Sequence, residues 1–308
     1  MKRYLSLFLA VVCMFCITAN STALTSSECN SLDAECIMRT GSDNPAYDGK
    51  LYGYNAMGGA TAEGFIAFSA ETGNIEHQDA QQFRLIGGAY YNGLVYAYGI
   101  ELIDNFYEIP HWYVIDPTTW TVQQDELRNV CYDMTYDYST DTMYAITPYM
   151  MAEHMQLCSV DITNGQLSVI TEITLPSNEE ARMVACGRNG MLFLISSTGN
   201  LYTVNKTTGA ANLVGGTGKS FCTSGDYYDI QQSMIYDPTD GMLYAAQYNG
   251  TSSTLLVINP ETAAVVSERQ LGAIRLTSLF AFYNPEDYAN DPEPTPEPTP
   301  EPPVEEHD

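Results

Sequence analysis

A four-part unit recurs along this chain at intervals of roughly 40–50 residues. In residues 234–271, four short apolar segments rich in Ile, Leu, Val and Tyr are separated by three polar breaks. These residue types suit the pleated, half-buried surface of a β-strand, and the breaks at 237–241 and 259–262 carry the Pro, Asp, Asn and Gly of tight turns. The pattern predicts four antiparallel strands, a to d, with tight a–b and c–d turns and a looser b–c loop.

The unit can be counted from two markers that recur in step. The residue that opens the c–d turn falls at Ser69, Asp116, Asp161, Asn205 and Asn259. The aromatic residue late in strand b falls at Tyr52, Tyr96, Tyr144, Phe193 and Tyr244. Repeated four-stranded units at this spacing are the signature of a β-propeller. The sequence therefore predicts an all-β, five-bladed β-propeller with four antiparallel strands in each blade.

The two ends of the repeat region complement each other. The first unit starts at Lys50 with strand b and has no strand a, whereas one strand, 276–283, is left over after the fifth unit. Inserting the C-terminal strand as the inner strand of blade one leaves no open sheet edge, the hazard that closed β architectures avoid. We therefore predict a propeller over residues 50–284 in which both ends of the chain build blade one.

The first 23 residues have the pattern of a secretory signal peptide. Two basic residues precede the apolar run 4–17, and small residues lead to Ala23. We expect cleavage after Ala23 and a mature protein that is secreted or at the cell surface. The alternative is a lipoprotein anchored at Cys13 or Cys16, which is disfavoured because neither cysteine follows a small residue.

Two further segments lie outside the repeats. Residues 24–49 are rich in Ser, Asp and Asn, and we interpret them as an N-terminal capping segment. Residues 285–308 are dominated by Pro and Glu, which cannot form a core, so they predict an extended, disordered tail or spacer. No stretch after the signal is long and apolar enough to span a bilayer, which argues against membrane insertion.

The charge of the chain excludes two classes of partner. The formal net charge is −26. Such a surface repels phosphate backbones and anionic lipid headgroups, so we expect no binding to nucleic acid or to an anionic membrane. Acidity also favours solubility, and we expect a monomer.

Cysteine usage is compatible with export. Six cysteines remain after the signal, an even number that suits disulfides in an exported chain. Cys29 and Cys36 are the best pair because both lie in a short segment outside the repeats. Cys131 and Cys158 fall in strands a and c of one blade, about 9–10 Å apart across strand b and beyond disulfide reach. Buried free thiols are the alternative for these two and for Cys186, and the mature chain has no CxxC pair or Cys/His cluster that would indicate zinc.

The repeat fixes which connections share a face of the propeller. The b–c loops and the blade-to-blade d–a loops lie on one face, here called the loop face, and they are long and irregular. The a–b and c–d turns lie on the opposite turn face. Variable loops on a rigid scaffold are where binding residues concentrate, and aromatic rings with polar groups suit sugars or peptides. The candidate ligand-binding residues on the loop face are Tyr98, Tyr107, His111, Trp112, Tyr149, Tyr227, Tyr228 and Tyr248. The alternative is that these rings pack between blades.

Carboxylates on the same face give a rival hypothesis, a carbohydrate-active enzyme such as a glycosidase or lyase. The candidate acids are Glu101, Asp104, Glu108, Asp226 and Asp229. No pair among them is distinguished by the sequence. His111 and His154 have acidic neighbours but no metal-ligand spacing, and no nucleophile elbow, phosphate loop or dinucleotide fingerprint occurs. We expect no catalytic residue, no metal and no cofactor.

Three stretches carry a wider resemblance: YDPTDGMLYAA at 236–246, LLVINPETA at 255–263 and LYTVNKTTG at 201–209. They resemble the broad class of exported propellers with YVTN-like, NHL-like or quinoprotein-like repeats, over about residues 50–283. The resemblance implies the fold, but hardly the function, because the motif reports how a blade is built. A quinoprotein-like enzyme would need cofactor-binding residues that this sequence does not show.

These observations together predict a secreted, non-catalytic propeller that binds a glycan or an extracellular protein on its loop face. The carbohydrate-active enzyme is one alternative. A structural domain of the cell surface is the other.

The polar residues that open the turns are interpreted as turn formers rather than as ligands: Asp116, Asp161, Asn205, Asp237 and Asn259. We expect Asp237→Ala to lower the free energy of unfolding by about 1 kcal/mol, because a local side-chain-to-backbone bond is lost. Urea denaturation measures this change. Ligand binding should be unchanged, and a loss of binding without a loss of stability would overturn the assignment.

Overall fold

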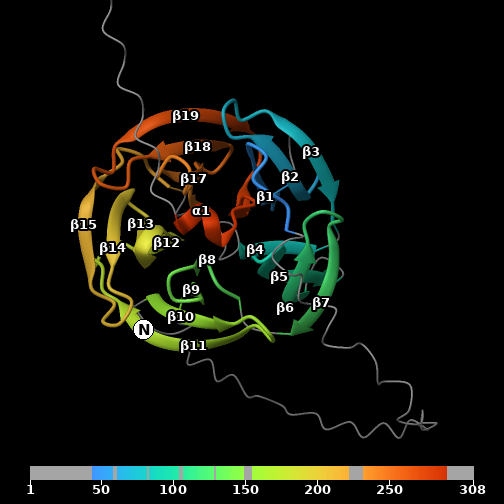
Figure 1. Cartoon of the computed structure of the whole chain (residues 1–308), viewed down its shortest axis with the longest axis horizontal. Helices are drawn as coiled ribbons and strands as arrows, with labels where there is room; N and C mark the ends of the chain where they lie inside the picture. Colours follow the sequence, from blue (N-terminus) through green and yellow to red (C-terminus); the bar gives the residue numbers. More distant parts are fainter. Residues whose placement is uncertain are drawn as a thin grey trace, which may run out of the picture. The chain divides into compact units, whose positions relative to one another are not determined.

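The structure is a computed structural model, and it describes residues 44–57, 61–81, 83–103, 107–127, 130–148, 155–221 and 232–289. All of these residues belong to one compact unit, Arg39–Asp308. They form five four-stranded antiparallel sheets that stand as blades around a ring (Figure 1). This arrangement confirms the predicted five-bladed β-propeller.

The strands of each blade are named here from the inner to the outer strand. Blade one contains β20 (Leu276–Phe280), β1 (Lys50–Asn55), β2 (Gly64–Ser69) and β3 (Ile75–Ala80). Blade two contains β4 (Phe83–Tyr91), β5 (Leu94–Ile103), β6 (Tyr107–Asp116) and β7 (Thr121–Leu127). Blade three contains β8 (Asp133–Asp137), β9 (Thr142–Pro148), β10 (Met155–Asp161) and β11 (Gln166–Ile173). Blade four contains β12 (Ala181–Cys186), β13 (Leu192–Ser196), β14 (Asn200–Val204) and β15 (Ala211–Gly216). Blade five contains β16 (Ser233–Tyr236), β17 (Leu243–Tyr248), β18 (Ser253–Ile258) and β19 (Val265–Gly272).

In the described residues, two short helical elements accompany the strands. A 3-10 turn, Arg188–Gly190, connects β12 with β13. Helix α1, Pro285–Ala289, follows β20 and lies over the centre of the ring (Figure 1). No helix in the described ranges is long and apolar enough to cross a membrane.

Burial along a blade explains the residue pattern of each strand. Every residue of β8, β12 and β20 is buried, because an inner strand packs against both neighbouring blades. In the outer strand β19 every second residue is exposed, because only one face of this strand packs against the protein. Continuous burial therefore marks inner strands, and alternating exposure marks the outer strand β19.

The C-terminal strand closes the ring as predicted. β20 pairs antiparallel with β1, with Tyr52 opposite Phe280 and Tyr54 opposite Thr277. The register shifts between these pairs, and Ser278 adopts a positive φ of 50°. This is the geometry of a β-bulge, in which an extra residue on one strand is left without an opposite partner.

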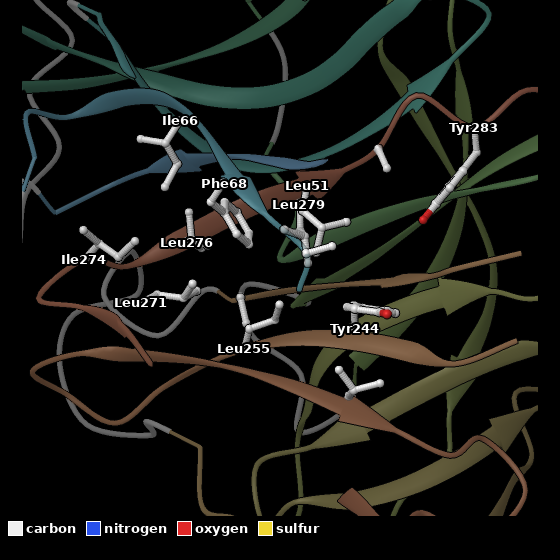
Figure 2. Packing of buried hydrophobic residues seen from close by; sticks show 14 residues of the cluster. Leu51, Ile66, Phe68, Tyr244, Leu255, Leu271, Ile274, Leu276, Leu279 and Tyr283 are labelled. Carbon is white, nitrogen blue, oxygen red and sulfur yellow. The ribbon is translucent and has the colours of Figure 1, made fainter. Parts of the chain in front are cut away.

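The hydrophobic core lies between the blades rather than within them. Five clusters of buried residues each combine side chains from two adjacent blades. Figure 2 shows the cluster where blades one and five meet, with Leu51 and Leu276 facing Tyr244 and Leu255. Burying one such Leu stabilises the fold by about 1.5–3 kcal/mol relative to leaving it in water. Each blade is therefore stabilised mainly by its neighbours.

The turn-forming residues act as the sequence indicates. The Asp116 carboxylate accepts the Thr118 N–H at 2.9 Å, and the Asp237 carboxylate accepts the Thr239 N–H at 2.7 Å. Asn259 accepts the Glu261 N–H at 2.8 Å in the same way. These bonds satisfy backbone donors at the turn face and leave its connections short and regular.

Two expectations about segments and cysteines need comment. Pro285–Ala289 form α1, so the prediction of a tail beginning at residue 285 is wrong for these residues. Proline suits the first helical position, and the Asp287 carboxylate accepts the Asn284 N–H at 2.7 Å, which caps the turn. The thiols of Cys131, Cys158 and Cys186 are buried and free. The pair Cys29–Cys36 lies outside the described residues.

Closure by β20 predicts the effect of two truncations. A chain that ends at Gly272 lacks the inner strand of blade one and exposes the edge of β1, so we expect it to lose cooperative thermal unfolding. A chain that ends at Ala289 lacks only residues 290–308 and should keep the melting temperature of the whole chain. Calorimetry compares the two, and a cooperative transition in the shorter chain would contradict the role assigned to β20.

Candidate functional site

Among the described strands, β5 and β6 of blade two form the b–c hairpin with the longest strands. β5 and β6 have 10 residues each, whereas the corresponding strands of blade four have 5 each and those of blade five have 6 each. Its register runs out to the pair Ile103 and Tyr107 at the loop end. The additional length therefore projects toward the face where the sequence predicts binding.

His111 lies on this hairpin between two carboxylates. Its Nε2 atom is 3.3 Å from Oε2 of Glu101 on β5, and its Nδ1 atom contacts the carboxylate of Asp125 on β7. The side chains of Glu101 and Asp125 are 51% and 50% exposed, whereas that of His111 is 12% exposed. The ring stacks on Tyr113 with centroids 5.6 Å apart. The imidazole is therefore held in place, while both carboxylates keep acceptor atoms toward solvent.

A second charged pair lies at the loop ends of blades one and two. Nη2 of Arg84 is 3.0 Å from Oε1 of Glu63, which precedes β2. Arg84 is on β4, directly opposite Ile100 of the long hairpin. The loop-face edge of these two blades thus presents both signs of charge in a fixed arrangement.

Two of the predicted ligand-binding residues are core residues of the fold. Tyr98 and Trp112 are fully buried between blades two and three, with their rings 4.8 Å apart. The Tyr98 hydroxyl donates to the carbonyl of Gly165 at 2.5 Å. A Cβ at Gly165 would lie 2.5 Å from the Trp112 ring, so this glycine makes room for the indole. Neither ring reaches the surface.

The remaining candidates are placed as follows. Tyr248 is buried in blade five, where its N–H donates to Oε1 of Gln232 at 2.6 Å and its hydroxyl contacts Sδ of Met57 at 2.8 Å. Tyr107 lies in β6, but its side chain is outside the described part of the structure. The residues outside the described ranges altogether are Tyr149, Tyr227 and Tyr228. Of the candidates with a described side chain, His111 is the one at the surface.

The axis of the ring carries a buried polar centre that sequence reasoning missed. Asp133 of β8 is fully buried, and Oδ2 accepts the N–H groups of Val184 at 3.0 Å and Met234 at 3.3 Å. The Ser233 hydroxyl contacts Oδ1 at 2.9 Å and also accepts the Leu279 N–H at 3.0 Å. These bonds connect blades three, four, five and one. In the described part of the chain no cation lies within ion-pair distance of this carboxyl.

Burial raises the pKa of Asp133 well above its usual range. The hydrogen bonds from Val184, Ser233, Met134 and Met234 oppose this shift, but they do not outweigh the loss of solvation. The interior of the ring therefore favours the neutral form of this carboxyl more than water does.

The turn-face end of the channel is covered by a group of tyrosines. Tyr288 of α1 stacks on Tyr138 with centroids 4.4 Å apart and lies 6.3 Å from Tyr236 and 6.4 Å from Tyr283. Burial raises the pKa of the Tyr138 and Tyr288 hydroxyls, which keeps both neutral. The sequence signal for this group was the aromatic residue inside NPEDY, which was interpreted as part of the tail.

Metal chemistry has no arranged ligand set in this region. Within the ranges that the structure describes, no group of three His, Cys, Asp or Glu side chains is placed to hold a metal ion.

Comparisons with known proteins assign no family to this chain. No protein-family model and no curated protein matches the sequence. A structural-genomics protein of unknown function from Bacteroides thetaiotaomicron is similar in structure, with 15% identity over 69% of this chain and 48% of that chain and a TM-score of 0.41. A nidogen/laminin complex matches with 9% identity over 76% of this chain and 98% of that chain, at a TM-score of 0.45. TolB from Acinetobacter baumannii matches with 10% identity over 77% of this chain and 67% of that chain, at a TM-score of 0.47.

This chain spans about half the length of the Bacteroides protein, at 48%. At these identities and TM-scores the similarities carry no argument about function. The class established by the sheet topology is that of a five-bladed propeller repeat protein.

The neutral Asp133 carboxyl predicts a specific dependence of stability on pH. Since its folded pKa lies above its unfolded value of about 3.9, its contribution is complete below pH 4 and is lost as pH rises through the folded pKa. Asp133→Asn keeps an uncharged group of the same shape, so we expect it to match the natural chain at acidic pH and to become relatively more stable toward neutral pH. Urea denaturation across this pH range measures the difference.

Asp133→Ala is the matched comparison for that variant. It leaves several buried donors without an acceptor, and we expect its free energy of unfolding to lie about 3 kcal/mol below that of the Asn variant at every pH, because neither side chain titrates. An Asn variant that is destabilised as strongly as the Ala variant at neutral pH would show that the carboxyl is ionised in the fold.

Proposed function

We propose that this protein is an exported, non-catalytic propeller that binds a glycan or an extracellular protein through its loop face. The observation that carries the proposal is the long β5–β6 hairpin, which holds His111 between Glu101 and Asp125 at that face. Export rests on the signal-peptide pattern of the first 23 residues.

The chemistry of this group suits a ligand with many hydroxyl or amide donors. The half-exposed carboxylates of Glu101 and Asp125 can accept hydrogen bonds, and the guanidinium of Arg84 supplies donors at the neighbouring strand end. Because His111 and Glu63 hold these groups in place, little side-chain entropy is lost when a ligand binds. Fixed acceptors beside fixed donors favour recognition of a polar surface such as a sugar chain.

The turn face supports this assignment by contrast. Its connections are short turns whose polar groups bond to their own backbone, as at Asp116 and Asp237. The mouth of the channel on that face is covered by α1 (Figure 1). The loop face is therefore where variable side chains are available to a large ligand.

The same geometry argues for binding rather than catalysis. A general acid in a glycosidase is usually a carboxyl whose apolar surroundings keep it protonated. Glu101 and Asp125 are half exposed and lie beside an imidazole, and Glu63 is paired with Arg84. These are the surroundings of carboxylates that accept hydrogen bonds.

A glycan array probed with the mature chain, residues 24–308, tests the proposal. We expect binding that leaves the glycan intact, and we expect His111→Ala to weaken it about tenfold, or about 1.4 kcal/mol, because both carboxylates lose the group that orients them. Glu261→Gln is the matched control, since it removes one exposed carboxylate from a c–d turn on the opposite face.

Thermal unfolding of both variants confirms that the fold is kept. Cleavage of a bound glycan, detected by product analysis, would contradict the non-catalytic proposal. Equal binding by the His111 and Glu261 variants would contradict the assignment of the binding site to the group around His111. If no glycan binds, the same two variants are tested against an extracellular protein ligand. Weaker binding by the His111 variant alone would assign that ligand to the loop face, and equal binding by both variants would not.

A further inference from the structure

Helix α1 covers the turn-face mouth of the central channel with a single deeply placed side chain. The Tyr288 ring lies among tyrosines of three different blades, Tyr138 of blade three, Tyr236 of blade five and Tyr283 of blade one. Its hydroxyl donates to the carbonyl of Tyr236 at 3.3 Å. Stacked and edge-on rings at these separations attract one another beyond simple burial. The mouth of the channel is thus a three-sided aromatic pocket with a fourth ring inside it.

The pocket is not completely filled by that ring. A cavity of about 40 Å³ lies beneath it, lined by residues of the inner strands that include Ala89, Met134, Leu279 and Phe280. This space is enough for a water molecule. Tyr288 is among the residues that line the cavity, so the cavity adjoins α1. The space available to a ligand at this mouth is therefore the volume of the Tyr288 ring plus this cavity.

The attachment of α1 is slight compared with that of the strands. The helix has 5 residues, of which Tyr288 is only partly buried against the neighbouring blades, whereas every residue of β20 is buried. Besides the Tyr288 contacts, Nη2 of Arg188 donates to the carbonyl of Asp287 at 3.3 Å. A helix this short has no stability of its own. Segments with few buried contacts open locally without global unfolding.

The ring does not need α1 in order to close. The pairing of β20 with β1 ends at Phe280, and the following residues, Ala281 to Tyr283, are themselves buried. Release of residues 285–289 would therefore leave blade one intact and expose the rings of Tyr138, Tyr236 and Tyr283.

We propose that the turn-face mouth of the channel is a binding pocket for one aromatic ring, which Tyr288 occupies in the closed state, so that α1 acts as a lid. The ligand class is an aromatic side chain or a small phenol, because the pocket already holds a tyrosine ring between three others. This site is separate from the loop face and does not depend on the function proposed for it.

Titration with p-cresol, the side chain of tyrosine as a free molecule, tests the pocket. A chain that ends at Asn284 lacks the lid and keeps β20, and we expect p-cresol to raise its melting temperature in a saturable way. Binding to the whole mature chain should be at least about tenfold weaker, since an intact lid leaves the competent state in a minority. Tyr288→Ala should bind p-cresol more tightly than the whole chain does.

Tyr202→Ala is the matched control, because it removes a buried tyrosine from β14 in blade four. Its affinity for p-cresol should be no greater than that of the whole chain. Hydrogen exchange gives a second readout of the lid. Amides of residues 286–289 should exchange faster than those of β20, and p-cresol should accelerate them while β20 stays protected.

Several outcomes would overturn the proposal. A chain ending at Asn284 that fails to fold, together with exchange of residues 286–289 as slow as that of β20, would make α1 an integral part of the ring. A folded chain of that length whose melting temperature does not respond to p-cresol would show that no aromatic pocket exists. If p-cresol stabilised the Tyr288 and Tyr202 variants equally, it would be filling any space left by a removed tyrosine rather than a specific pocket.

Discussion

The carboxyl of Asp133 connects inner strands that share no sheet. It accepts backbone N–H groups from β12 and β16, and Ser233 relays the contact to Leu279 of β20. Inner strands have no hydrogen-bonded neighbour on the channel side, so side chains such as this one link the inner strands of different blades. The Thr277 hydroxyl extends the set by donating to the carbonyl of Leu85 in blade two, at 2.8 Å.

Much of the fold could be predicted because its determinants are local. A turn such as 237–241 specifies its own backbone through one Asp side chain, and the alternation of apolar residues specifies the strand that follows. Closure by β20 could be inferred by counting, because one strand was left over and one blade lacked a strand. None of these steps requires knowledge of which blades face each other.

The candidate site was harder to predict because it depends on contacts between distant residues. Trp112 and Tyr98 lie near the loop end in sequence, but the slot that takes the indole is made by Gly165 in the next blade. A sequence signal existed: Trp112 to Ile115 is an unbroken apolar run, which indicates a strand buried on both faces. Asp133 gave no such signal, since its partners are 51 and about 100 residues away along the chain. Tyr288 was missed because the Pro and Glu around it resemble the tail that follows.

The ring thus has the buried carboxyl of Asp133 at its centre and α1 over its turn face, with a polar surface exposed on the loop face. The most direct test is the carboxyl ¹³C resonance of Asp133, assigned by its absence from the Asp133→Asn chain and followed from about pH 2 to about pH 8. The account predicts that this resonance stays at the neutral-acid position through the pH at which ordinary aspartates ionise, about 3.9. A resonance that titrates with those aspartates would contradict it, because the centre of the ring would then hold a buried negative charge.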